Sequence, residues 1–115
     1  MRQFSRIRTK LLGYKIDPDM LRAYRSAIPS TIEVQVNTKA DTYIATIKSV
    51  DGEVLPKEVF LITEAENADL LLDMVNDLVF SYKNIPETYR PYYKQILRPE
   101  GSVARTESLK LVKAS

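Results

Sequence analysis

Four acidic residues recur at intervals of three and four, the spacing that places side chains on one face of a helix. They are Glu66, Asp69, Asp73 and Asp77. A row of carboxylates binds a hard cation, contacts a basic protein or is simply a solvated helix face. Because like charges four residues apart repel by roughly 0.2–0.5 kcal/mol per pair, the row is slightly unfavourable by itself. The chain lacks the alternating acids and glycine of a calcium-binding loop, so we predict no metal site and leave the other two interpretations open.

The composition excludes most catalytic chemistry. The 115 residues include no cysteine and no histidine, which removes thiol nucleophiles, thiolate metal sites and the commonest general base. Only three glycines occur, and none belongs to a phosphate-cradling loop. A carboxylate pair such as Asp41 and Glu58 would need environments that separate the two pKa values, and nothing in the sequence indicates them. We therefore predict a binding protein that is not an enzyme and uses no cofactor.

The N-terminal segment is a second candidate site because it is basic. Through residue 25 the chain has seven basic residues and two acidic ones, whereas residues 41–77 have nine acids and two lysines. Basic side chains of this kind contact phosphates without reading bases. The alternative function is therefore nucleic-acid binding, and the other interpretation is a solvated helix or a flexible arm. The candidate residues are Arg2, Arg6, Arg8, Lys10 and Lys15.

Two further features concern surfaces. A tyrosine group either forms an interface or packs one helix against another, and it consists of Tyr82, Tyr89, Tyr92 and Tyr93. No apolar run approaches the roughly 20 residues that span a bilayer, and the N-terminus has no signal-peptide core. We expect a cytoplasmic protein without a membrane partner.

The N-terminal third is predicted to be helical. Residues 3–13 have apolar side chains near helical spacing and form a short basic helix that ends at Gly13. A second helix begins at Asp17, because Asp caps free amides and the following Pro18 suits the first helical position. It stops before Pro29, and its apolar side carries Met20, Leu21, Tyr24 and Ile28.

The middle of the chain changes to a period of two. Residues 31–36 alternate between apolar and polar side chains, which is typical of a half-buried strand. A polar turn at 37–41 leads to a second strand at 42–50, rich in β-branched residues. Residues 59–62 form a short third strand with little alternation, which predicts burial on both faces.

The acidic row falls on the clearest predicted helix, at 64–83. Thr63 is its predicted N-cap, and Glu66 completes a capping box. The apolar stripe consists of Ala68, Leu71, Met74, Val75, Leu78, Val79 and Tyr82, and the opposite side includes Asn76 with the acids. Another helix is predicted at 87–98, and the tail at 102–115 adds a final strand or frays.

These elements predict an α+β fold with a three- to four-stranded antiparallel sheet covered by one main helix. They belong to a single domain with a basic helical extension at 1–30, a β-β-β-α core at 31–86 and a C-terminal helix and tail at 87–115. An exposed edge strand in such a sheet favours pairing with a second copy, so we expect a homodimer.

The core resembles HicB-like antitoxin domains. The resemblance rests on the segments Thr31-Ile32-Glu33-Val34-Gln35-Val36 and Asp41-Thr42-Tyr43-Ile44-Ala45-Thr46-Ile47, followed by Phe60-Leu61-Ile62-Thr63 and a helix ending near Pro86. It implies a partial ribonuclease-H-like fold that works as a non-catalytic binding module, as an antitoxin in a toxin–antitoxin system. The implied partner is HicA-like, a small basic RNA-cleaving toxin, to which the acidic residues would be presented. The family's "leu-pro-gly" loop element and its C-terminal DNA-binding segment are both missing here.

Overall fold

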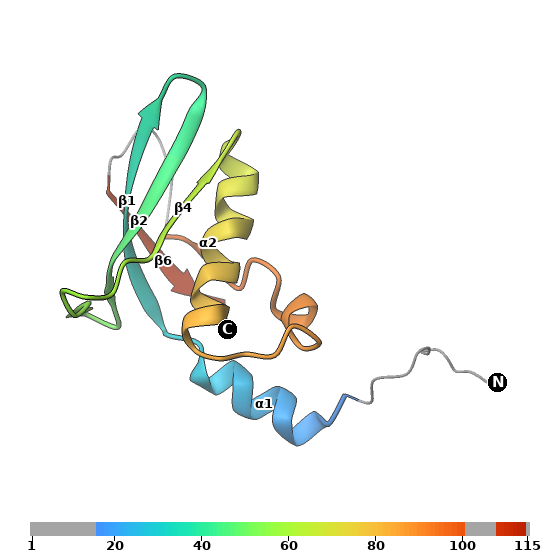
Figure 1. Ribbon diagram of the computed structural model, residues 1–115. Coiled ribbons are helices and arrows are strands. Elements are labelled where there is room, and N and C mark those ends of the chain that lie inside the picture. Colours follow the sequence, from blue (N-terminus) through green and yellow to red (C-terminus); the bar gives the residue numbers. More distant parts are fainter. Residues whose placement is uncertain (1–15, 101–107, 115) are drawn as a thin grey trace.

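The computed structural model describes residues 16–100 and 108–114 (Figure 1). Its elements are α1 (Pro18–Ala27), β1 (Thr31–Lys39), β2 (Thr42–Val50), β3 (Glu53–Val54), β4 (Ile62–Ala65), α2 (Ala68–Tyr82), the 3-10 helix η1 (Arg90–Tyr93), β5 (Leu97–Pro99) and β6 (Ser108–Lys113). The α+β prediction is confirmed for this part of the chain. The predicted helix at 3–13 lies outside the described residues.

The antiparallel sheet has six strands, more than the three or four predicted. Its order is β3-β2-β1-β6-β5, and β4 also pairs with β2. The β1–β2 hairpin matches the prediction, although β1 continues to Lys39. The C-terminal strand β6 pairs with β1 from Thr31↔Val112 to Gln35↔Ser108, so it lies inside the sheet. The position of β6 is determined by its pairing with β1, which is distant in the sequence. Local sequence patterns therefore did not predict the number of strands.

The predicted third strand and the start of the following helix are both wrong. Strand β4 begins at Ile62, and Phe60 before it is 77% exposed instead of buried. Successive side chains of β4 point to opposite faces of the sheet, so one set of them faces away from the core. Thr63 pairs with Ala45 inside the sheet and caps nothing. The N-cap of α2 is Asn67, whose side chain accepts a hydrogen bond from the Leu70 N–H at 2.9 Å.

Helix α2 covers one face of the sheet with a stripe that differs from the predicted one (Figure 1). Its buried residues are Leu71, Val75, Asn76, Val79 and Phe80. Met74, expected in the stripe, is 44% exposed, and Asn76, expected on the polar side, is only 1% exposed. The predicted stripe is therefore rotated away from the observed one by about one residue position.

Asn76 joins α2 to β5 through two buried hydrogen bonds and makes a third, part-buried one within α2. Its amide nitrogen donates to the carbonyl oxygens of Leu72 (2.9 Å) and Leu97 (3.0 Å), and its Oδ1 accepts from the Leu97 N–H at 2.9 Å. The side chain thus pairs with the Leu97 backbone as a neighbouring strand would. A polar group this deeply buried is tolerated because its donors and its acceptor are satisfied.

The helix predicted at 87–98 is wrong. Only the four residues of η1 are helical, and β5 occupies the end of the range. Pro91 has no N–H to donate to a helical ladder. Gln95 then adopts a left-handed φ of 52°, which stops any helix from continuing. The Leu97 backbone bonds Asn76 instead.

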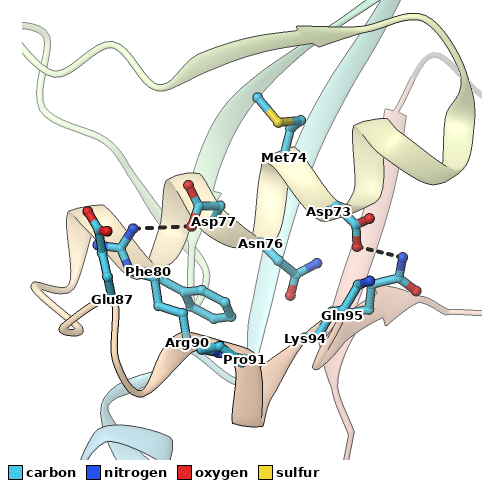
Figure 2. Close-up of a pocket in the computed structure, with 10 residues that line it drawn as sticks. All are labelled: Asp73, Met74, Asn76, Asp77, Phe80, Glu87, Arg90, Pro91, Lys94 and Gln95. Carbon is cyan, nitrogen blue, oxygen red and sulfur yellow. Dashed lines mark hydrogen bonds and ion pairs between the residues drawn. The ribbon is translucent and has the colours of Figure 1, made fainter. Parts of the chain in front are cut away.

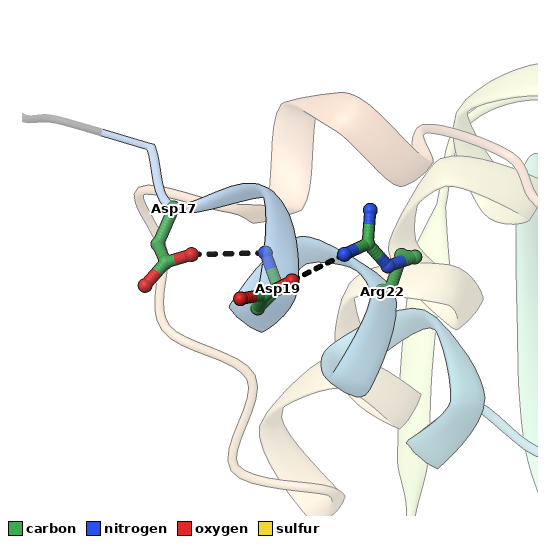
Figure 3. Close-up of polar contacts among 3 residues, drawn as sticks. All are labelled: Asp17, Asp19 and Arg22. Atoms are coloured by element: carbon green, nitrogen blue, oxygen red, sulfur yellow. Dashed lines mark hydrogen bonds and ion pairs between the residues drawn. The ribbon is translucent and has the colours of Figure 1, made fainter.

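Helix α1 begins as predicted. The Asp17 side chain accepts a hydrogen bond from the Asp19 N–H at 2.9 Å, and Pro18 is the first helical residue (Figure 3). Leu21 packs against the core, whereas Met20 is 39% exposed. The Tyr93 hydroxyl donates to the Leu21 carbonyl and ties α1 to η1. One hydrophobic cluster includes residues from all three predicted segments, among them Ile28, Ile32, Val79, Leu97 and Leu111.

Replacing Tyr93 with phenylalanine is expected to cost about 1 kcal/mol of unfolding free energy, because the hydroxyl hydrogen bond to Leu21 is lost. Burial, and secondarily the neighbouring Tyr89, raises the pKa of Tyr93 above its usual 10.0. The unfolded chain therefore releases this proton at lower pH than the folded one. The contribution of protonated Tyr93 to the free energy of unfolding should be full below pH 10, the pKa of an ordinary tyrosine, and should fall as the pH rises through the higher pKa of the folded protein. Urea unfolding of the wild-type protein and of Tyr93→Phe across this pH range measures the difference. An equal fall in unfolding free energy with pH in both proteins would contradict a raised pKa of Tyr93.

Candidate functional site

Three of the four predicted acidic residues form one row on α2. Asp69, Asp73 and Asp77 lie four residues apart along the helix, and we call them the acidic row. Glu66 is exposed but precedes the N-cap Asn67, so it is not part of the helical row. The structure places three of the four acidic side chains on α2 and leaves Glu66 outside the helix.

Gln95 contacts two members of the acidic row. Its Nε2 donates to Asp73 Oδ1 at 2.7 Å and to Asp69 Oδ1 at 3.3 Å, and the shorter contact is drawn in Figure 2. A neutral amide orients these carboxylates without cancelling their charge. The row therefore keeps its negative character while its side chains are held in place.

Arg90 contacts the third member. Its Nη1 lies 3.1 Å from Asp77 Oδ1, and its Nε donates to the Ile85 carbonyl at 2.9 Å (Figure 2). The Asp77 side chain is 59% exposed, so this ion pair is screened by solvent and adds little stability. Arg90 anchors η1 to α2 and partly compensates the charge at one end of the row.

Two apolar side chains lie exposed beside the acidic row. Leu70 is 47% exposed and Met74 is 44% exposed, each one position after an aspartate of the row. Their four-residue spacing makes a second row parallel to the first. We call these five residues the α2 face. Contiguous exposed apolar surface rimmed by polar residues marks interaction sites, which makes the α2 face a candidate binding surface.

An open groove of about 600 Å³ runs between α2 and the segment that carries η1 (Figure 2). Met74 and Phe80 give it apolar walls, and its charged side chains have both signs. The lining residues are Asp73, Met74, Asn76, Asp77, Phe80, Glu87, Arg90, Pro91, Lys94 and Gln95. The groove borders the α2 face and offers space for a partner's side chain.

The structure separates the one carboxylate pair considered for acid–base chemistry. Asp41 lies in the β1–β2 turn, whereas Glu58 precedes β4, near the opposite end of β2. They cannot act as an acid–base pair. Within residues 16–100 and 108–114, no group of three acidic side chains is placed to hold a metal ion.

The predicted nucleic-acid contacts lie outside the described residues: they are Arg2, Arg6, Arg8, Lys10 and Lys15. Two further basic residues of that segment are described, and both have internal partners. Arg22 pairs with Asp19 on α1 (Figure 3), and Arg25 donates to the Ala114 carbonyl at 2.6 Å. Both arginines therefore use part of their hydrogen-bonding capacity within the protein.

The tyrosine group packs mainly within the protein. Tyr93 is 4% exposed and lies edge-on to Phe80, with ring centroids 6.2 Å apart. Tyr89 packs edge-on against Tyr24 at 4.9 Å. Tyr92 differs, because 59% of it is exposed. The packing interpretation is confirmed for Tyr89 and Tyr93.

Sequence reasoning missed Leu70, Met74, Arg90 and Gln95. One signal was present: Leu70-Leu71-Leu72 puts three leucines side by side, more than one helix face can bury. Arg90 and Gln95 carried no such signal, since their contacts depend on how the segment after α2 folds back.

Comparison with known proteins gives no match: no family model fits the chain, and no curated protein or solved structure is significantly similar to it. No helix in the described part of the chain is both long and apolar enough to cross a membrane.

Proposed function

We propose that this chain is a non-catalytic protein-binding module whose α2 face binds a basic protein. The observation that carries the proposal is the pairing of two rows on α2: exposed Leu70 and Met74 beside Asp69, Asp73 and Asp77. Neither row alone indicates a partner. Together they match a surface on which aliphatic side chains are flanked by lysine or arginine.

The two rows contribute differently to such a complex. Covering the exposed parts of Leu70 and Met74 removes apolar area from water, which supplies affinity. The aspartates attract a basic partner at a distance and disfavour acidic ones, which affects association rate and specificity. Gln95 and Arg90 already hold all three carboxylates, so fewer side-chain rotamers remain to be fixed on binding.

The partner class that we propose is a small basic protein like the HicA-type toxins bound by HicB-like domains. Support comes from the chain order at 31–86, where a β-hairpin, a strand beside it and a covering helix follow one another. In this proposal the protein acts in the cytoplasm as an antitoxin-like inhibitor. The partial ribonuclease-H-like fold implied by the resemblance remains part of the same proposal.

The alternative is nucleic-acid binding through the basic N-terminal residues, with the folded core used for dimerisation. Its support is the excess of basic over acidic residues through position 25. Binding of this kind weakens steeply as salt rises, because each phosphate contact releases counterions. The two functions therefore separate under nuclease treatment and in a salt series.

The test is recovery of the tagged protein from its native host, with and without nuclease, followed by mass spectrometry. We expect one small basic protein in stoichiometric amount after nuclease treatment. Changing Asp69, Asp73 and Asp77 to asparagine should weaken its binding by at least about tenfold, since asparagine retains shape but removes three charges. A matched triple change of Asp41, Glu53 and Glu58 to their amides, away from α2, should leave binding unchanged.

Two outcomes would count against the proposal. Equal retention of the partner by the asparagine variant and by the matched control would show that the α2 face is not the contact. Loss of all bound material on nuclease treatment would favour the nucleic-acid alternative instead.

A further inference from the structure

The face of the sheet opposite α2 is covered by no helix or strand of the described residues (Figure 1). Strand alternation assigns side chains to this outer face. Ile62 pairs with Thr46, which lies between the buried residues Ala45 and Ile47 and so points away from the core. A register shift between Glu33 and Val34 places Ser49 opposite exposed Glu33, to which its hydroxyl donates. Val54 pairs with Ser49 and so shares this outer side, although Ser49 itself is only 4% exposed.

Three large apolar side chains are gathered on this outer face, and we call them the sheet patch. Val54 is 83% exposed, Phe60 77% and Ile62 53%. Phe60 precedes β4, but the Leu61 carbonyl accepts a hydrogen bond from the Ile47 N–H at 2.9 Å, so the pairing with β2 continues to Leu61. Alternation then puts Phe60 on the same side as Ile62. The three expose on the order of 400 Å² of apolar surface, as large as the main patch on a typical monomer and often functional at that size.

We propose that a second copy of this chain covers the sheet patch, so that two outer faces pack against each other in a symmetric dimer. The charges around the sheet patch are the first argument for a second copy as its partner. The exposed charged residues of the outer face and of the loop beside the patch have both signs, Lys48, Lys57 and Lys110 against Glu33, Glu58 and Glu64, so this surface is complementary to itself. The α2 face is different: its acidic row would repel a second copy.

The area is also right for a dimer. Two patches together remove about 800 Å² of apolar surface, roughly half of the ~1,600 Å² buried in a standard interface. The polar rim supplies the remainder, which gives the usual anatomy of an apolar centre inside a polar border. This dimer uses a different surface from the α2 face, so it does not depend on the proposed function.

Sedimentation equilibrium of the full chain over a micromolar concentration series tests the proposal. The wild-type protein should have dimer mass, and Phe60→Ser should raise the dissociation constant about 30-fold, as expected for a central aromatic anchor. Because Phe60 is exposed in the monomer, the circular dichroism spectrum of the Phe60→Ser protein should match that of the wild type. Val54→Ser provides a second variant with the same expected direction.

The matched control is Leu70→Ser, which removes an exposed apolar side chain from the α2 face and should not change the dimer. A wild-type protein that sediments as a monomer throughout would overturn the proposal. So would a Phe60→Ser dimer as tight as the wild type, or a dimer weakened by Leu70→Ser but by neither patch variant.

Discussion

Replacing Asn76 with leucine is expected to lower the free energy of unfolding by about 3 kcal/mol. Leucine has as many side-chain heavy atoms as asparagine and is no smaller, so the loss is not a cavity effect. The change instead leaves the Leu97 N–H and C=O without their side-chain partner, in a buried site where Asn76 is 1% exposed. Each buried polar group left unsatisfied costs about 1–3 kcal/mol. Part of this is offset by burying an apolar side chain in place of an amide.

Urea unfolding measures the Asn76→Leu effect, and Ser81→Ala on the exposed side of the same helix is the control, expected within about 0.5 kcal/mol of wild type. Amide hydrogen exchange adds a local readout, because the Leu97 N–H should exchange faster in the variant. An Asn76→Leu protein as stable as the control would contradict the role of Asn76 in holding β5.

Truncating Leu111 to alanine is expected to cost about 3 kcal/mol, within the range measured for buried leucines. Leu111 is 2% exposed and pairs with Ile32 of β1 and Pro99 of β5, so it packs in the centre of the sheet. The cost depends on β6 lying between β1 and β5. It would be small if the C-terminal tail were merely frayed.

Thermal unfolding of Leu111→Ala and Leu70→Ala separates these cases. Both changes remove the same atoms, but Leu70 is 47% exposed and should lose much less stability. Equal midpoints for the two variants would mean that β6 does not occupy the centre of the sheet.

The parts of the fold that local rules govern were predictable. Asp17 and Pro18 gave the start of α1, because a cap and a first-turn proline act within a few residues. The β1–β2 hairpin followed from alternation. The places of β5 and β6 were not predictable, since their pairing partners are distant in the chain and a three-residue strand has no periodicity to detect.

The errors on α2 share one cause. A polar residue was assigned to solvent and a methionine to the core, whereas Asn76 is buried and Met74 is exposed. The deciding factor is Leu97, whose backbone provides the hydrogen bonds that make a buried asparagine acceptable. No hydrophobicity pattern within the helix contains that information.

The candidate site was predictable only in outline. The four-residue spacing of Asp69, Asp73 and Asp77 was visible in the sequence, and the structure places them in one row. Their contacts with Gln95 and Arg90 required the chain after α2 to turn back, which a helix at 87–98 would not have done in the same way. The left-handed conformation of Gln95 had no sequence signal, because it is not a glycine.

The most direct test of binding through the α2 face is carboxylate footprinting of the complex recovered from the native host. Free and bound protein are labelled at accessible carboxylates with a carbodiimide and an amine, and the labelled peptides are quantified by mass spectrometry. Our account predicts that Asp69, Asp73 and Asp77 lose labelling on binding, while Asp41 and Glu53 stay as reactive as in the free protein. Undiminished labelling of the acidic row in a stoichiometric complex would contradict it.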